Sequence, residues 1–440
     1  MWSRVVRLSL VTGCGVGGSI VNFLAQAIIA ARFGAGQNVD AYVFSLGLPT
    51  FLAGLLATCV SYIVVPEIAR VASDPERERA LSGKLLVVVC TIAALLALTA
   101  LPAVLIQPSL LLPAGSTIRD HPQLSLLIML AWATGGFQLI NALFISRLNA
   151  VGRQVIAATL SLPPGILSVM VLLTVPTNSI WIVAIGVLMG TLTVTLIGWS
   201  IQRTHFSWCS RASASGTAPT PIPRSAWLSV IALTCFSSYA VIDSFWAPRV
   251  GSGALASLGY AQRILIGAGN LVILGPSAIV VPMLARLAAQ NDARGFRKII
   301  AAIGLGVGGG GAVIATCIVF FASPLVSLLF KRGRFDSAAA AQVASALAHL
   351  APGMAAMLIG VMVMRAVFCI PNSFRLAAGI GLGWSVLYFI LSGLFVERGV
   401  VGIADAYSTA WITTSAVGSL MLWRRSASLG IVKNAERSTC

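Results

Sequence analysis

Four charged residues lie within long apolar stretches of this 440-residue sequence, and they are the residues best placed to carry chemistry there. Arg263 interrupts LGYAQRILIG and Asp243 interrupts YAVIDSFWAP, while Asp40 and Asp405 stand near the starts of two further stretches. A charge in apolar surroundings is costly, so it usually faces a cavity or a partner of opposite charge. We therefore treat these positions as candidates for binding or ion transfer.

Arg263 suits an anionic ligand, because the planar fork of guanidinium donors matches the oxygens of a phosphate group. The alternative is structural, with Arg263 paired to Asp243 or to backbone carbonyls. Asp243 is correspondingly either a protonatable or cation-coordinating group or one partner of that ion pair. The sequence leaves both alternatives open.

Asp40 and two arginines near the ends of apolar stretches each have a structural and a functional interpretation. Asp40 is expected to cap a helix and make a loop contact, and its second interpretation is ion or proton coupling. Arg32 and Arg249 follow the first apolar stretch of each half of the chain. Such arginines commonly extend to the membrane interface, and the functional alternative is a basic rim that handles a phosphate.

No catalytic or metal-binding set accompanies these residues in the sequence. The three histidines (His121, His205 and His349) are isolated, and the eight cysteines are scattered without a CxxC spacing. The Gly-rich stretches lack the GK[ST] ending of a nucleotide loop. The sequence therefore predicts a protein that is not an enzyme and that carries no cofactor and no metal.

Composition indicates which elements must position the candidate residues. The chain is 58% hydrophobic and 9% charged, which is too apolar for a soluble protein of this length. Apolar stretches of about 20 residues predict membrane-crossing helices, and the alternating segments of a β-barrel are absent. We expect an all-α membrane protein with about twelve spans: 8–31, 41–65, 83–106, 123–146, 154–175, 179–201, 226–247, 256–283, 298–321, 339–366, 376–395 and 400–423.

An internal repeat predicts two related halves. IVVPEIARVA (63–72) recurs as IVVPMLARLA (279–288), with seven of ten positions identical at a spacing of 216 residues. A stretch rich in Ser, Thr and Pro separates the sixth and seventh expected spans, as is typical of a linker. The expected organisation is a six-helix lobe (1–202), a cytoplasmic linker (203–225), a second six-helix lobe (226–425) and a cytoplasmic tail (426–440).

The distribution of Lys and Arg predicts the orientation. With the N-terminus inside, the expected cytoplasmic segments carry 21 of these residues and the outer loops carry seven, so both termini are expected in the cytoplasm. This bias also accounts for the formal charge of +17 without a nucleic-acid partner. Two halves in the same orientation form a parallel repeat, an architecture typical of transporters.

Four motifs resemble those of the lipid II flippases (MurJ/MviN type), members of the multidrug/oligosaccharidyl-lipid/polysaccharide (MOP) exporter superfamily. The motifs are AIIAARFGAGQNVDAYVFSLGLP (27–49), LGYAQRI (258–264), LLFKRGRFD (328–336) and MRAVF (364–368), in the order and spacing of that family. The resemblance covers nearly the whole chain. It also accounts for the basic KRGR loop (331–334), which in the family lies outside despite its charge.

The resemblance implies two six-helix lobes around a cationic cavity that moves an undecaprenyl-pyrophosphate-linked sugar to the outer leaflet. Arg263 falls where the family has a cavity arginine, and Asp40 keeps an acidic position. Other family arginines fall here on Ser19, Ala25, Ala53 and Gly54. One remaining arginine would compensate poorly for the free energy of desolvating a pyrophosphate. The sequence therefore does not decide which substrate is moved.

The leading hypothesis is a flippase of the bacterial inner membrane that works by alternating access on lipid II or a related lipid-linked oligosaccharide. Arg263 would contact the pyrophosphate, with Arg32 and Arg249 as further candidates, and Asp243 or Asp40 would couple an ion or proton. The expected partners are the lipid-linked glycan, membrane lipids and glycan-assembly enzymes. The alternatives are a cation-coupled drug or metabolite exporter of the same superfamily, and a degenerate scaffold for glycan assembly that transports nothing.

Overall fold

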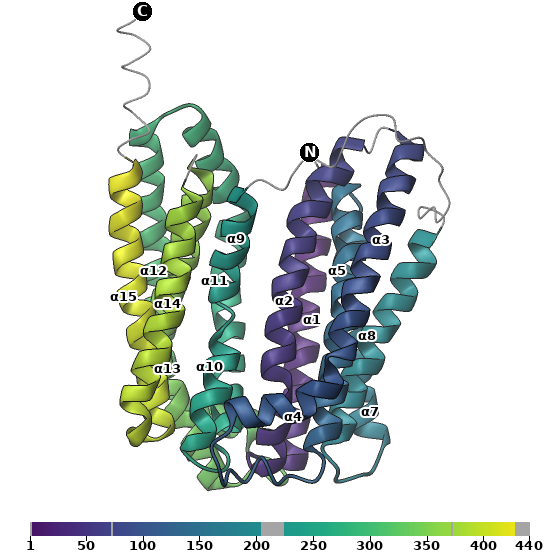
Figure 1. The fold of residues 1–440 in the computed structure, drawn as a ribbon. Helices are drawn as coiled ribbons and strands as arrows, with labels where there is room; N and C mark the ends of the chain where they lie inside the picture. Colours follow the sequence, from purple (N-terminus) through teal and green to yellow (C-terminus); the bar gives the residue numbers. More distant parts are fainter. Residues whose placement is uncertain (1, 72–73, 204–223, 371–372, 427–440) are drawn as a thin grey trace, which may run out of the picture. The chain divides into compact units, whose positions relative to one another are not determined.

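The protein is described by a computed structural model that covers residues 2–71, 74–203, 224–370 and 373–426, in which every long regular element is an α-helix (Figure 1). Nine helices of this described part are long and apolar enough to cross a membrane. The prediction of an all-α, multi-pass membrane protein is therefore confirmed. Nearly all of the expected linker (203–225) and tail (426–440) lies outside the described residues.

Three of the expected spans are not single helices. The stretch 83–106 is divided between α3 (Pro75–Leu98) and α4 (Ala100–Leu111), and 154–175 between α6 (Gln154–Thr159) and α7 (Pro163–Thr174). The third, 226–247, is divided between α9 (Arg224–Cys235) and α10 (Tyr239–Trp246). Proline explains the second break, because Pro163 and Pro164 open α7 and lack the N–H groups that would continue α6.

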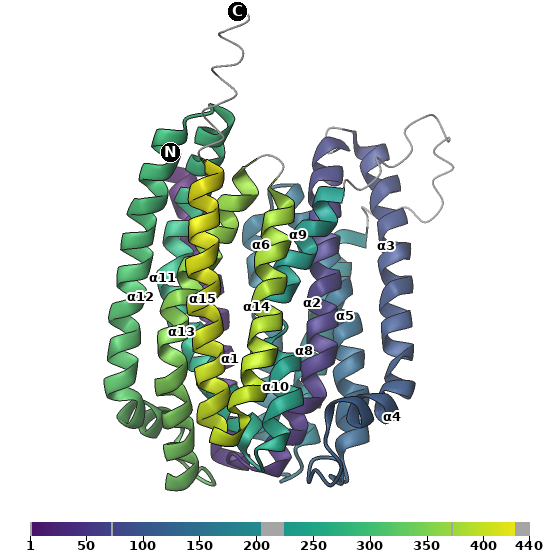
Figure 2. The same ribbon diagram turned by 60° about the vertical axis from the view of Figure 1, so that its left-hand side comes forward.

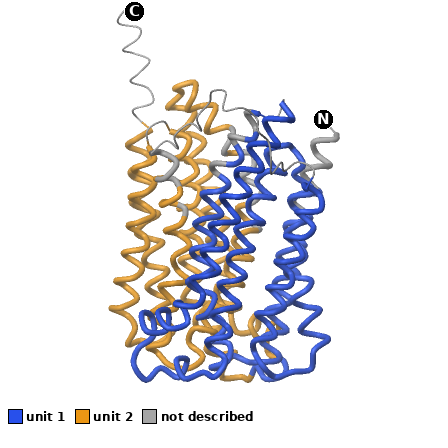
Figure 3. The backbone as a smooth tube through the Cα atoms, turned by 45° about the vertical axis from the view of Figure 1, so that its right-hand side comes forward, with its two compact units in different colours: residues 1–223, 332–335 blue, residues 224–331, 336–440 orange. Residues whose placement is uncertain are grey.

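The chain forms two compact units, which are distinguished by colour in Figure 3. Unit 1 comprises residues 1–223 together with 332–335, and unit 2 comprises 224–331 and 336–440. Residues 332–335 belong to the KRGR-containing loop, so a short piece from the second half of the sequence is built into unit 1.

Unit 1 is organised around α5 (Leu124–Ala150), which packs against α2, α3 and α8. Its core joins Val64 and Ile68 of α2 to Leu86 of α3 and to Leu143 and Phe144 of α5. In this unit α1 spans Trp2–Phe33, α2 spans Gln37–Val71 and α8 spans Trp181–Gln202.

Unit 2 is organised around α13 (Ser337–Cys369), which packs against α11, α12 and α15. Met364 and Val367 of α13 lie in a core with Phe296 of α12, Leu422 of α15 and Ile380 of α14. The remaining elements of this unit are η2 (Ala247–Arg249), α11 (Ala254–Ala289), α12 (Ala293–Phe330), α14 (Phe374–Phe395), η3 (Val396–Arg398) and α15 (Val400–Ser426).

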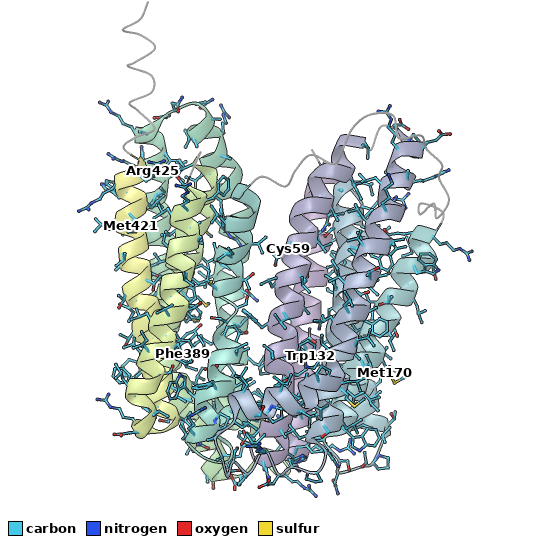
Figure 4. All side chains as sticks on the ribbon, in the orientation of Figure 1. Cys59, Trp132, Met170, Phe389, Met421 and Arg425 are labelled. Atoms are coloured by element: carbon cyan, nitrogen blue, oxygen red, sulfur yellow. The ribbon has the colours of Figure 1, made fainter. Side chains whose placement is uncertain are left out.

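Large apolar side chains cover much of the outside of the helices, as expected for surfaces that face lipid. Figure 4 shows Met170, Phe389 and Met421 on such surfaces, where they are 52%, 41% and 45% exposed. Exposure of these side chains to water would cost free energy, whereas exposure to lipid does not. Charged groups inside the units are consequently paired, and Arg147 of α5 meets Glu78 of α3 at 2.6 Å with both side chains buried.

Candidate functional site

Asp243 is buried inside unit 2 and is held by side chains from two other helices. It lies on α10 and is only 3% exposed. Gln262 of α11 donates from Nε2 to Asp243 Oδ2 at 2.7 Å, and the hydroxyl of Tyr388 of α14 donates to Oδ1. Each carboxylate oxygen thus has a donor, which is the minimum that a buried carboxylate needs.

Aromatic rings enclose the Asp243 site on the side of α14 and α15. Trp384 packs against Tyr388 at 5.5 Å between ring centroids and against Trp411 at 4.8 Å, and Tyr407 meets Tyr388 edge-on at 5.6 Å. All four rings are buried. These four rings form an aromatic wall that keeps the surroundings of the carboxylate apolar. A change in the charge of Asp243 would therefore interact strongly with neighbouring groups.

Arg263 follows Gln262 directly on α11 but is an exposed side chain. Within the described part of the chain, Asp243 is bonded to Gln262 and Tyr388, and Arg263 has no ion pair with it. The structural alternative, in which Arg263 and Asp243 form an ion pair, is therefore not what the structure shows. Arg263 is connected to the Asp243 site through the chain, because the residue before it, Gln262, donates to Asp243.

Arg249 lies in the same unit, at the end of η2, six residues after Asp243. Its guanidinium donates to the carbonyl of Phe245 and lies over the Phe245 ring, with Cζ 3.7 Å from the centroid. Trp246 is also in range, at 5.4 Å. These contacts stabilise the charge locally and fix where the guanidinium lies.

Arg32 lies in unit 1 and its guanidinium is engaged by backbone carbonyls. It donates to Leu172 and Val175 at the end of α7 and, at 2.6 Å, to Thr177. The last carbonyls of a helix carry partial negative charge and have no partner within the helix, so a cation there satisfies them. This geometry gives Arg32 a structural role at the end of α7.

Asp40 also lies in unit 1, in the first turn of α2, and is fully buried. Its amide donates to the carbonyl of Gly36 at 3.0 Å. An acidic side chain in the first turn of a helix is favoured by the helix dipole, but α2 begins at Gln37, so Asp40 is not the N-cap residue itself. Unit 1 thus holds Arg32 and Asp40, while unit 2 holds Asp243, Arg249 and Arg263.

Residues 332–335, which include most of the KRGR loop, dock onto the end of α1 and onto Gly34 after it, within unit 1. The amide of Arg334 donates to the carbonyl of Ala31 at 2.8 Å. Two glycines allow this approach: Gly34 has φ +72° and Gly333 has φ +62°, and a Cβ on either would crowd the other segment. The structure thereby brings together FGAG and KRGR, two motifs that lie about 300 residues apart in the sequence.

The positions where the family resemblance expects further arginines are small side chains in unit 1. Ala25 and Ala53 are buried at 4% and 1% exposure, so an arginine at either position would require repacking. Ser19 is exposed, and its hydroxyl donates to the Gly15 carbonyl of its own helix. Gly54 is exposed and has open space beside it.

Gln262, Tyr388 and the aromatic rings around Asp243 could not be recognised as site residues from the sequence. Polar and aromatic residues in apolar stretches carry no period that marks a shared site, and the contact between α10 and α14 joins residues 145 positions apart. The same is true of His349, treated above as isolated, whose Nδ1 lies 2.7 Å from Asp405 Oδ1. Among the described residues, no group of three or more His, Cys, Asp or Glu side chains could hold a metal ion.

Comparisons with solved structures show which fold the helices form. The chain matches a structure described as lipid II flippase MurJ in an inward closed conformation, with a TM-score of 0.73 and 18% identity over 96% of this chain and 90% of that chain. It also matches an inward-facing multidrug resistance MATE family transporter of the MOP superfamily, with a TM-score of 0.78 and 16% identity over 97% and 98% of the two chains. At these identities the matches establish the fold alone.

Sequence comparisons establish the family to which the chain belongs. A curated relative, the lipid II flippase MurJ of Burkholderia cenocepacia, is 29% identical over 120 residues, a match that covers 27% of this chain and 23% of that protein. A family model described as lipid II flippase MurJ matches residues 29–436, which is nearly the whole chain. The chain therefore belongs to the lipid II flippase MurJ family.

Proposed function

We propose that this protein is a flippase that moves an undecaprenyl-pyrophosphate-linked glycan across the bacterial inner membrane. Family membership supports transport rather than enzyme chemistry. The observation that carries the proposed site is Arg263, an exposed arginine within the apolar stretch LGYAQRILIG of α11. It is next in sequence to Gln262, which donates to the buried carboxylate of Asp243. A charge there is costly in lipid and is best explained by a ligand of opposite charge.

Arg263 is the proposed contact for the pyrophosphate. Its guanidinium can bind two phosphate oxygens at once, and it has no carboxylate partner among the described residues. Arg32 and Arg249 are weaker candidates, because backbone carbonyls and aromatic rings already hold their guanidinium groups. With Ser19, Ala25, Ala53 and Gly54 at the other family positions, a related lipid-linked oligosaccharide is favoured over lipid II itself.

Asp243 is the proposed coupling residue. A proton or a cation on its carboxylate would change the hydrogen bonds that it accepts from Gln262 of α11 and Tyr388 of α14. Because these bonds connect three helices, the change would be transmitted to the packing of unit 2. Asp40 of unit 1 is a second candidate for this role.

The proposed mechanism is alternating access of two six-helix lobes, residues 1–202 and 226–425, with both termini in the cytoplasm. The repeat of 63–72 in 279–288 and the bias of Lys and Arg in the loops support this arrangement. The proposed partners are the lipid-linked glycan, membrane lipids and enzymes of glycan assembly.

A second candidate function is a cation-coupled exporter of drugs or metabolites. A buried carboxylate enclosed by aromatic rings suits a cationic organic ligand, and the fold is shared with a multidrug resistance MATE transporter. A scaffold that transports nothing is the third candidate, supported by the small residues at the family's arginine positions.

Depletion of the protein in its native host separates the three candidates. The flippase predicts accumulation of one lipid-linked sugar on the inner leaflet, measured by its inaccessibility to a probe added outside intact cells. Retention of a drug without such accumulation would favour the exporter. Loss of glycan synthesis without accumulation of any precursor would favour the scaffold.

A further inference from the structure

Unit 2 contains a pocket that the proposed function does not use. Its volume is about 460 Å³, and α12, α13, η3 and α15 form its walls, with part of α14 at one edge. Both apolar and ionisable side chains line it. The residues that line it include Val319, His349, Pro352, Phe395, Arg398 and Asp405.

The pocket is a built feature of the helix packing. Both α12 and α15 pack mainly on α13, and Figure 2 shows α13 between them. Pro352 interrupts the backbone ladder of α13, since it has no N–H to donate. Beside it, Gly353 N donates to Ser408 Oγ at 3.0 Å, and Ser408 Oγ donates to the carbonyl of His349 at 2.6 Å. A hydroxyl from α15 thus bridges the backbone of α13 where the pocket lies.

Two opposite charges face the pocket without touching. Asp405 Oδ1 accepts from His349 Nδ1 at 2.7 Å, whereas Asp405 Oδ2 lies 4.0 Å from Arg398 Nη1. That second distance is too long for a hydrogen bond. The side chains of Arg398 and Asp405 are 66% and 30% exposed, and the guanidinium lies 5.1 Å from the Phe395 ring centroid. The pocket therefore presents one cation and one anion side by side, each with capacity for further hydrogen bonds.

The surface around the pocket is apolar. Val319, which lines it, is 43% exposed, and the next residues of α12, Phe320 and Phe321, are 76% and 62% exposed. Leu394, just before η3, is 68% exposed. A patch of this kind on a membrane protein faces lipid chains rather than water. A ligand of this pocket should therefore combine a zwitterionic head with an apolar tail.

We propose that this pocket binds the headgroup of an aminophospholipid such as phosphatidylethanolamine. The ammonium group would donate to Asp405 Oδ2, and the phosphate would accept from the fork of Arg398. His349 positions the carboxylate, and the acyl chains lie on the apolar surface beside Val319. An anionic lipid without an amine would bring its phosphate against Asp405 and gain less. Lipid binding at this pocket requires that the protein lies in a membrane and does not depend on the transport mechanism.

Native mass spectrometry of the purified full chain in detergent tests this proposal, with phosphatidylethanolamine and phosphatidylglycerol added in separate titrations. We expect phosphatidylethanolamine to bind more tightly. Arg398→Ala and Asp405→Asn should each weaken that binding about tenfold, since each removes charge-assisted hydrogen bonds. The matched control is Arg375→Ala, an exposed arginine at the start of α14, which should leave the binding unchanged.

Several results would overturn the proposal. One is equal binding of the two lipids, and another is an equal loss of binding in the Arg375→Ala control. If soluble phosphoethanolamine bound as tightly as the lipid, the apolar surface would not contribute to binding. Because Arg398 is exposed, its variants should fold, and a melting temperature equal to that of the unaltered protein verifies this. Arg398→Lys keeps the charge but loses the fork, so it should bind the lipid with intermediate affinity.

Discussion

Asp243 shows how a single carboxylate can be buried among apolar helices, because Gln262 and Tyr388 each donate to one of its oxygens. We expect Tyr388→Phe to lower the free energy of unfolding by about 1–3 kcal/mol, since it leaves a buried charge short of a donor. When Asp243 is replaced by Asn, Tyr388→Phe should lower the free energy of unfolding by a smaller amount. A double-mutant cycle measured by thermal unfolding in detergent tests this, and additive effects of the two substitutions would contradict the coupling.

Unit 1 contains a buried ion pair between Arg147 and Glu78. Arg147 donates from Nε and Nη2 to Glu78 Oε1 at 2.8 and 2.6 Å, and from Nη1 to Gln202 at 3.1 Å, which joins α5 to α3 and α8. Glu78→Gln would leave the guanidinium buried without its counter-charge and should destabilise the protein by about 3–5 kcal/mol.

The control for this prediction is the exposed pair of Arg77 and Asp74, whose side chains are 76% and 45% exposed at a distance of 3.2 Å. Arg77→Ala should cost less than about 1 kcal/mol. If the two variants melt at the same temperature in the same detergent, the ion pair of Arg147 and Glu78 does not contribute as described.

His121 gives unit 1 a dependence on pH at the loop before α5. Its Nε2 lies 2.9 Å from Asn38 Oδ1, and its Nδ1 accepts from the amide of Gln123 at 3.2 Å, so the ring is neutral with the proton on Nε2. Burial lowers the pKa of His121 below its ordinary value. The unfolded chain therefore binds the proton more readily, and the unit should lose stability as the pH falls below about 6.5.

The measurement for His121 is the melting temperature between pH 7.5 and 5.5, compared with that of His121→Gln. The variant keeps a side chain that can donate to Asn38 but cannot titrate, so its melting temperature should change less over this range. A parallel fall in both proteins would assign the pH dependence to other groups.

At the scale of elements, the KRGR loop and the turn after α1 depend on their glycines. Gly333 has φ +62°, and a Cβ there would collide with the carbonyl of Ala31, which accepts from the amide of Arg334. Gly333→Ala should therefore undock the loop and speed tryptic cleavage at Lys331 and Arg332. The matched control is Gly152→Ala, at φ +76° with open space around it, which introduces the same backbone strain without the collision. Equal cleavage of these two variants would contradict the docking.

The elements also show where the sequence was sufficient and where it was not. Hydrophobic stretches locate the helices because length and apolar composition suffice for that. The break between α9 and α10 could not be predicted in this way, because Ser237 and Ser238 do not differ from the small polar residues found within other apolar stretches. In the structure, Ser238 Oγ donates to the carbonyl of Cys235 at 2.7 Å, a local bond that competes with helix continuation.

At the scale of the whole molecule, the sequence identified the family from motifs and identified Asp243 and Arg263 as costly charges. It did not identify the partners of Asp243, because they come from helices distant in sequence. It also left Arg32 and Arg249 as ligand candidates, whereas the structure gives each guanidinium a local set of contacts. A charge inside an apolar stretch marks a site, but its role follows from the neighbours that folding supplies.

Arg263 is the residue on which the proposed transport depends most directly. The decisive measurement is the fraction of lipid-linked glycan that becomes accessible at the outer surface of cells producing Arg263→Ala, compared with Arg286→Ala, an exposed arginine of the same helix. At equal protein levels, we expect outer-surface glycan to fall about tenfold or more in Arg263→Ala, because a charge-assisted contact to the pyrophosphate is lost. We expect it to stay unchanged in Arg286→Ala. Normal glycan export in Arg263→Ala would contradict the account.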